Sequence, residues 1–145
     1  MEMRIKGLHP NFIMPAKGSA DAAAWDIHMP EAGIADGESK FFPLGFATEI
    51  PKGFVALIQP RSSTGAKNGL ELNNTCGVID SDYRGEWKAA LRTKSGKPFE
   101  WKAGERVLQF FVVPVYTGQL ELVDELESTD RGAGGFGSSG TNSLG

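Results

Sequence analysis

The densest group of side chains that could do chemistry lies in residues 73–86, where the sequence reads NNTCGVIDSDYRGE. The apolar run CGVI leads directly into Asp80, and further charged residues and Tyr83 follow at once. Turn formation explains one aspartate but not so many ionisable side chains together. A carboxylate at the end of a buried strand can orient a water molecule or act as a general base. The tyrosine ring beside it can pack on a sugar or a base, so this segment is the strongest candidate site.

A second candidate is PRSSTG, residues 60–65, in which an arginine and several hydroxyls precede a glycine. Hydroxyls and backbone N–H groups at the start of a helical turn can bind a phosphate, and Arg61 can add a bidentate hydrogen bond. The alternative is a Ser/Thr helix cap beside a surface arginine, which is common in proteins.

The C-terminal stretch RGAGGFGSSGTNSLG, residues 131–145, contains six glycines. Such a tract is usually a flexible tail, because glycine loses much backbone entropy on ordering. Unobstructed N–H groups, hydroxyls and a stacking ring at Phe136 are also the chemistry of a loop that wraps phosphates. We therefore expect a β domain over residues 1–130, followed over residues 131–145 by either a flexible tail or a mobile lid that orders over a ligand.

Two polar residues interrupt otherwise apolar segments. Asp26 lies within AAAWDIHM, where a carboxylate needs a partner unless the position faces outward on an alternating strand. Gln109 lies within GERVLQFFVVPV, where it either binds a ligand or is satisfied by neighbouring backbone. Both interpretations stay open for each residue.

The composition is that of a globular protein of one ordinary domain: 145 residues, 40% hydrophobic and 23% charged. A net charge of −3 argues against duplex DNA or an anionic membrane as a partner. The single cysteine, Cys76, fits a reducing cytosol and excludes an internal disulfide framework. Two histidines and one cysteine are too few ligands for a structural zinc site, so any metal is expected to be a hard cation held by oxygen.

Short apolar segments bounded by Gly, Pro, Asp or Asn recur along the chain, which predicts an all-β sandwich or barrel. One stretch, STGAKNGLEL, could hold a short helical turn. The expected strand segments are MRIKGL, AAAWDIHM, KFFPLGFATEI, GFVALIQ, CGVID, WKAALRT, ERVLQFFVVPVY and QLELVD.

These residues together resemble the trimeric dUTPase family, whose five motifs appear in order as AAWDI, PRSSTG, NTCGVIDSDYRGE, GERVLQ and RGAGGFGSSG. The resemblance implies a jelly-roll-like β fold and hydrolysis of dUTP to dUMP and pyrophosphate by water attack on the α-phosphate, assisted by Mg²⁺. That reaction keeps uracil out of DNA and supplies dUMP for thymidylate synthesis. The resemblance also implies a cytoplasmic homotrimer with active sites between subunits.

Carried over position by position, the resemblance makes Asp80 the catalytic base and Asp26 a holder of magnesium through water. Tyr83 packs beneath the deoxyribose, Phe136 stacks on uracil, and the tail of one subunit closes a site formed by the other two. The implied substrate-binding residues are Arg61, Ser62, Ser63, Asn74, Gly77, Ile79, Tyr83, Gln109, Arg131, Phe136, Gly137, Ser138 and Ser139.

The chain departs from the family pattern at a few positions. Ala24 and Trp25 stand where Gly-Tyr is usual, Ser63 where many members have glycine, and Leu108 where alanine is common. None of these departures removes a catalytic group.

Two other functions compete with dUTP hydrolysis. A dCTP deaminase would need a glutamate on the strand after the aspartate turn, where this chain has Ala89 and Ala90. A protein that uses dUTP to switch shape and bind a partner would also carry a ligand-ordered lid.

Overall fold

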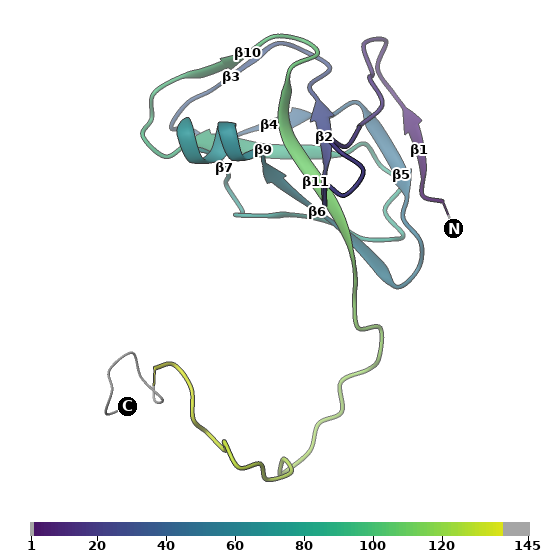
Figure 1. Cartoon of the computed structure of the whole chain (residues 1–145), viewed down its shortest axis with the longest axis vertical. Coiled ribbons are helices and arrows are strands. Elements are labelled where there is room, and N and C mark those ends of the chain that lie inside the picture. Colours follow the sequence, from purple (N-terminus) through teal and green to yellow (C-terminus); the bar gives the residue numbers. More distant parts are fainter. Residues whose placement is uncertain (1, 138–145) are drawn as a thin grey trace.

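The computed structural model describes residues 2–137, which form an antiparallel β domain followed by an extended C-terminal segment (Figure 1). The strands are β1 (Arg4–Gly7), β2 (Trp25–His28), β3 (Gly33–Ala35), β4 (Lys40–Pro43), β5 (Phe46–Glu49), β6 (Phe54–Pro60), β7 (Leu70–Leu72), β8 (Gly77–Ile79), β9 (Lys88–Thr93), β10 (Phe99–Trp101) and β11 (Arg106–Pro114). A short π-helical turn, η1 (Ser63–Lys67), lies between β6 and β7.

Four antiparallel sheets wrap around a common core, in agreement with the all-β, jelly-roll-like prediction. The largest has the order β2-β11-β6-β8, and the others are β4-β9-β7, β1-β5 and β10-β3. Neighbours in each sheet are mostly far apart in the sequence, as expected where strands cross between sheets instead of forming a simple meander. β11 pairs with β2 on one edge and with β6 on the other, so it joins the segments that carry the candidate phosphate contacts.

Aromatic rings hold the sheets together at the centre of the domain. Trp87 is fully buried; its ring centroid lies 4.7 Å from that of Phe46 and 4.9 Å from that of Phe110. The Trp87 Nε1–H donates to the Thr48 hydroxyl over 3.1 Å, so its polar atom is satisfied inside the core. Alternating burial along β9 directs Ala89, Leu91 and Thr93 toward the interior.

Seven of the eight predicted strand segments contain strands, with two corrections. KFFPLGFATEI contains two strands, β4 and β5, which lie in different sheets. They separate because Gly45 has φ +83° and an added Cβ there would lie 3.2 Å from Pro30, a conformation and a space that suit glycine alone. β3, β7 and β10 were not predicted. The short helical turn expected within STGAKNGLEL is present as η1, and β7 is formed by the last three residues of that stretch.

The prediction of a strand at QLELVD, residues 119–124, is wrong for the single chain. The backbone there forms no strand, and the last contact with the β domain in the hydrogen-bond network of residues 2–137 is Val115 N–H to the Gly53 carbonyl, 2.9 Å. After Val115 the chain leads away from the domain (Figure 1). An isolated strand has no partner for its backbone groups, so the alternating pattern alone does not make one.

No helix among the described residues is both long and apolar enough to cross a membrane.

Candidate active site

One group of site residues gathers around the carboxylate of Asp26. Arg61 Nε lies 3.1 Å from Asp26 Oδ1, and Arg106 Nη1 lies 3.2 Å from Oδ2. The pairing register explains the contact, because Gln109 of β11 lies opposite Asp26 of β2 on one side and Gln59 of β6 on the other. The Asp26 side chain is only 14% exposed, so its pairing with two arginines meets the need for a partner. Two guanidinium groups and one carboxylate leave an excess positive charge, which suits an anionic ligand.

The loop after β6 is fastened through Thr64, which leaves the hydroxyls of Ser62 and Ser63 exposed. The buried Thr64 donates to the Val107 carbonyl over 2.7 Å, and Arg61 Nη1 donates to the Arg106 carbonyl over 3.2 Å, which fastens η1 to β11. Ser62 makes no capping hydrogen bond at the start of η1, and both Ser62 and Ser63 are exposed. The helix-cap interpretation is therefore wrong, and the two hydroxyls stand beside Arg61.

Gln109 has the structural partner that one interpretation foresaw. Its Nε2 donates to the Pro60 carbonyl over 3.2 Å, and the side chain is half-buried. A primary amide has a second N–H, so this bond does not use its whole donor capacity. Its contact with a phosphate stays a prediction.

A second group of site residues surrounds the end of β8. The turn between β7 and β8 is closed by Thr75 N–H to the Leu72 carbonyl, 2.8 Å, and by Asn74 Nδ2 to the Cys76 carbonyl, 3.1 Å. Thr75 has φ +73°, which marks a tight turn. Gly77 packs so closely on β6 that an added Cβ would lie 3.0 Å from Ile58 Cβ.

The catalytic candidate Asp80 is exposed directly after the buried Ile79. Tyr83 N–H donates to the Asp80 carbonyl over 3.1 Å, which brings the two residues into one turn. The Tyr83 ring lies over Gly85, where an added Cβ would meet the phenol oxygen at 2.5 Å, and Tyr83 remains 42% exposed. A partly exposed ring beside an exposed carboxylate is the arrangement that the sequence predicted.

The two groups lie at opposite ends of β6. Ile79 pairs with Ala56, so Asp80 lies beside Val55, whereas Arg61 follows the other end of the strand. Arg61 is six positions beyond Val55 along extended chain, which is roughly 20 Å. A surface hollow of about 450 Å³ contains Asp80 and Val55 but neither Asp26 nor Arg61.

The described part of the tail touches neither group. Arg131 Nε donates to the Gly134 carbonyl, Gly134 N–H returns a bond to the Arg131 carbonyl over 3.2 Å, and Gly132 N–H bonds the Thr129 hydroxyl over 3.1 Å. The result is a local turn around Arg131. Phe136 is fully exposed, and Gly137 has φ +89°. Ser138 and Ser139 lie outside the described residues.

The departures from the family pattern are accommodated by packing. The Trp25 ring stacks on Phe110 with centroids 5.2 Å apart, and Lys17 Nζ lies 4.4 Å from the centre of the Trp25 ring. Leu108 is fully buried, and Ser63 is exposed beside Arg61. None of these side chains displaces Asp26 from the arginines.

Arg106 is a site residue that sequence reasoning missed. It stands within GERVLQ, but nothing in that motif distinguishes it from the other charged residues nearby. The signal that finds it is the pairing of β11 with β2, which sets Arg106 opposite His28, two residues from Asp26.

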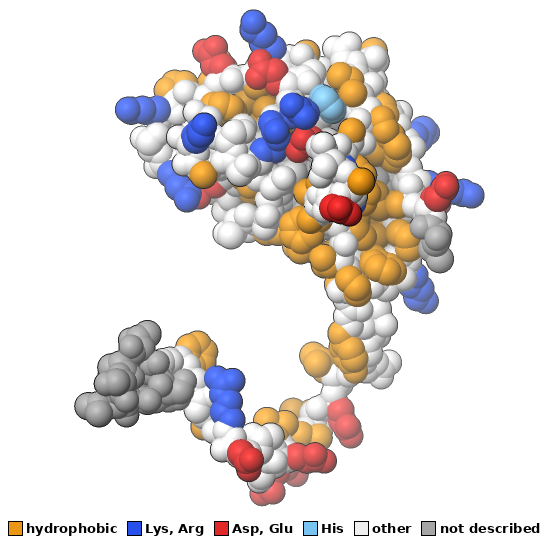
Figure 2. Space-filling model, viewed as in Figure 1, with side chains coloured by type: hydrophobic (Ala, Val, Ile, Leu, Met, Phe, Trp, Pro, Cys, Tyr) orange, Lys and Arg blue, Asp and Glu red, His pale blue; other side chains and the backbone are white. Residues whose placement is uncertain are grey.

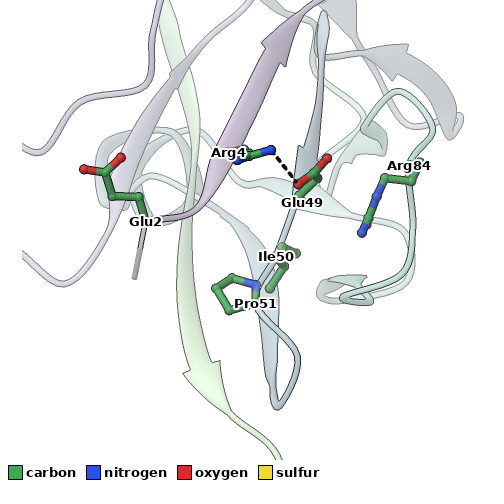
Figure 3. Close-up of a pocket in the computed structure, with 6 residues that line it drawn as sticks. All are labelled: Glu2, Arg4, Glu49, Ile50, Pro51 and Arg84. Carbon is green, nitrogen blue, oxygen red and sulfur yellow. Dashed lines mark ion pairs between the residues drawn. The ribbon is translucent and has the colours of Figure 1, made fainter.

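Another hollow, of about 540 Å³, lies beside the Asp80 turn and is drawn in Figure 3. Arg84 reaches it from that turn, and Arg4 and Glu49 form an ion pair across it at 3.8 Å. It is lined by Glu2, Arg4, Glu49, Ile50, Pro51 and Arg84 and contains none of the predicted nucleotide-binding residues. Within residues 2–137 no three His, Cys, Asp or Glu side chains cluster as a metal cage would require.

The chain matches a known protein family over most of its length. The family model described as dUTPase matches residues 10–140. The deoxyuridine 5′-triphosphate nucleotidohydrolase of Nautilia profundicola is 43% identical over 97% of this chain and 99% of its own, and that of Shewanella oneidensis is 41% identical over 90% and 88%. The Staphylococcus bacteriophage 80alpha dUTPase with dUPNHPP superposes with a TM-score of 0.86 at 27% identity, covering 96% of this chain and 98% of that one. A variant dUTPase of phage phi11, described as coordinating a structural Mg(II) ion, shares the fold, with a TM-score of 0.79 at 22% identity over 88% of this chain and 100% of its own. The motifs, the fold and these relatives together establish that the chain belongs to the dUTPase family.

Proposed function

We propose that this member of the dUTPase family, which hydrolyses dUTP, uses Asp80 as its general base and the group around Arg61 to bind the triphosphate. The observation that carries the proposal is the exposed Asp80 carboxylate at the end of an apolar strand, in one turn with the partly exposed Tyr83 ring. Asp80 takes a proton from the attacking water while the oxygen of that water forms a bond to the α-phosphorus. The bond from the α-phosphorus to the bridging oxygen breaks, and pyrophosphate leaves with the electron pair.

The remaining residues bind and orient the nucleotide in this proposal. The exposed Ser62 and Ser63 hydroxyls, with Arg61, contact phosphate oxygens. The turn that contains Asn74 and continues into β8 reads the uracil edge through its backbone. When the C-terminal segment closes over the nucleotide, Phe136 stacks on the base and Arg131 contacts the outer phosphates.

Magnesium enters the proposal through Asp26. Both oxygens of this carboxylate accept N–H groups from arginine, so it is suited to accept hydrogen bonds from waters on a hydrated ion rather than to bind the ion directly. A single carboxylate fits an ion held mostly by phosphates and water. Bound magnesium would neutralise part of the negative charge of the triphosphate, which otherwise repels a nucleophile.

Substrate selectivity tests the proposed role of Tyr83. We expect kcat/KM for dUTP, measured by release of dUMP and pyrophosphate with Mg²⁺, to exceed that for UTP, dTTP or dCTP by about 100-fold or more. Comparable values for dUTP and UTP would contradict the assignment of Tyr83 to the deoxyribose. Release of ammonia from dCTP would favour a deaminase, and tight dUTP binding with very slow turnover would favour the dUTP-sensing alternative.

We also propose that the complete site forms between copies of the chain in a homotrimer. The roughly 20 Å between the two groups on β6 supports this, because one nucleotide must reach both. Exposed apolar surface supports it too: Leu120 and Leu122 are 99% and 100% exposed, and an open apolar groove of about 750 Å³ includes Trp25 and Phe54. Figure 2 shows hydrophobic side chains gathered on the part of the domain nearest the C-terminal segment.

The assembly can be tested by sedimentation. We expect a species of three times the 15.6 kDa chain mass. Changing both Leu120 and Leu122 to Asp is expected to shift the mass toward the single chain, because charges replace apolar contacts. Glu121→Gln, between the two leucines, is the matched control and should keep the assembly. A monomer with full dUTP turnover would contradict a site shared between copies.

The location of the protein in the cytoplasm also stays a prediction.

A further inference from the structure

The turn that carries Asp80 and Tyr83 is held by hydrogen bonds from its own residues. Arg84 Nη1 donates to the Ser81 carbonyl over 2.6 Å, and Tyr83 N–H donates to the Asp80 carbonyl over 3.1 Å. These bonds fix the shape of the turn, but they do not fix its position relative to the domain.

Glu86 accepts one hydrogen bond from within this turn and one from the rest of the domain. Its backbone carbonyl accepts the Tyr83 hydroxyl over 2.9 Å, and its carboxylate Oε2 accepts Gly45 N–H over 3.0 Å. Glu86 therefore accepts hydrogen bonds from both the Tyr83 hydroxyl and the backbone of Gly45.

Gly45 is a rigid point to which such a link can attach. It is buried, its φ is +83°, and its carbonyl accepts Leu8 N–H over 2.7 Å. The residues on either side bond the backbone of Trp87: Leu44 N–H donates to the Trp87 carbonyl and Trp87 N–H to the Phe46 carbonyl. Gly45 N–H has the Glu86 carboxylate as its partner, and without that carboxylate it would be a buried donor left unpaired.

We propose that Glu86 is a positioning residue that sets the place of the Tyr83 ring and thereby the selection of deoxyribose over ribose. The proposal rests on the role given to Tyr83 above. Because the hydroxyl of Tyr83 is used to hold the ring, the face of the ring is what meets the sugar. If the ring moves, the space that excludes a 2′-hydroxyl opens, and contact with deoxyribose weakens.

The test compares Glu86→Ala, Glu86→Gln and Tyr83→Phe in the full-length protein, with kcat and KM measured for dUTP and for UTP. Glu86→Ala is expected to lower the ratio of the two kcat/KM values about tenfold or more, since a small displacement of a positioning group has effects of this size or larger. Glu86→Gln should keep the ratio, because its amide oxygen still accepts Gly45 N–H. Tyr83→Phe removes the hydroxyl that donates to the Glu86 carbonyl, so it should lower the ratio of the two kcat/KM values in the same way.

Two further measurements separate positioning from general destabilisation. Hydrogen exchange of the peptide spanning residues 80–87 should be faster in Glu86→Ala than in Glu86→Gln. The double variant Glu86→Ala/Tyr83→Phe should lower the ratio no further than Glu86→Ala alone, because both changes break one link. Glu71→Ala is the control: this half-buried glutamate pairs with Arg92 at 3.0 Å on the β4-β9-β7 sheet, and its loss should leave the ratio unchanged.

The outcomes distinguish this proposal from the one on which it rests. If the unmodified protein does not discriminate between dUTP and UTP, the role of Tyr83 itself is wrong. If it discriminates and Glu86→Ala leaves the ratio unchanged, the positioning role of Glu86 is overturned while that of Tyr83 stands. Should Glu86→Ala fail to fold, Glu86→Gln and Tyr83→Phe still decide: an unchanged ratio in Tyr83→Phe contradicts the proposal.

Discussion

Asp80→Asn is expected to lower kcat for dUTP by roughly 10²- to 10⁴-fold, which is the usual contribution of a positioned general base. Asparagine has nearly the same shape but cannot accept the proton of the attacking water. Because Asp80 is exposed and its backbone carbonyl still accepts Tyr83 N–H, the variant should fold normally and retain nucleotide binding. The measurements are steady-state turnover, binding of a non-hydrolysed dUTP analogue and the thermal unfolding midpoint.

Asp82→Asn is the matched control for this change. Asp82 is an exposed carboxylate two residues further along the same turn, so general effects of charge on the nucleotide should be similar. We expect its turnover to stay within a few-fold of that of the unmodified protein. Near-native turnover of Asp80→Asn would mean that another group orients the water.

Removing residues 131–145 is expected to abolish most dUTP turnover while the β domain and its assembly persist. The last strand ends at Pro114, and the last bond to the domain among the described residues comes from Val115, so the deletion removes no core contact found there. The deletion removes Arg131 and Phe136, together with the backbone N–H groups that would bind the phosphates. Turnover, sedimentation and the far-ultraviolet circular dichroism spectrum test this, with a deletion of residues 142–145 as a control that keeps the glycine-rich motif.

Mixed assemblies test whether the tail acts on a site of another copy. Tail-less chains retain Asp80, and Asp80→Asn chains retain the tail, so neither should turn over dUTP alone. After the two are unfolded and refolded together, activity should return at sites where an intact Asp80 meets a tail from a different chain. No recovery, in mixtures that demonstrably co-assemble, would mean that the tail closes the site of its own chain. Full activity of the tail-less protein would mean that the segment is a flexible end only.

Much of the fold could be predicted from short-range patterns. Apolar runs between turn residues identified the segments of the longer strands, such as β6 and β11, because most residues of these strands are buried or half-buried. The three-residue strands β3, β7 and β10 were missed, whereas β8, which is equally short, was found because it lies in the apolar run CGVI. QLELVD shows the opposite error: it has the alternation of a strand, but a strand also needs an edge to pair with, and the pattern of one segment does not supply it.

The candidate site was predictable where the motif itself contains the chemistry. The Asp80–Tyr83 turn and the Arg61 loop are each built within a few residues, so local sequence was enough to find them. Arg106 and Glu86 were not found, because their roles depend on contacts with Asp26 and Gly45 that are 80 and 41 residues away in the sequence. Such contacts follow from strand register and sheet order, which no single segment encodes.

In the proposed site, the pairing of Asp26 with two arginines gives the group that would bind phosphate its own counterion. Without that carboxylate, two neighbouring guanidinium groups would repel each other and attract whatever anion the solution offered. With it, the net positive charge offered to an incoming anion is smaller, so a small singly charged ion gains little by binding there. A triphosphate gains much more, because its several charged oxygens can engage both guanidinium groups at once. We therefore expect the proposed site to discriminate against inorganic anions before uracil or sugar is recognised.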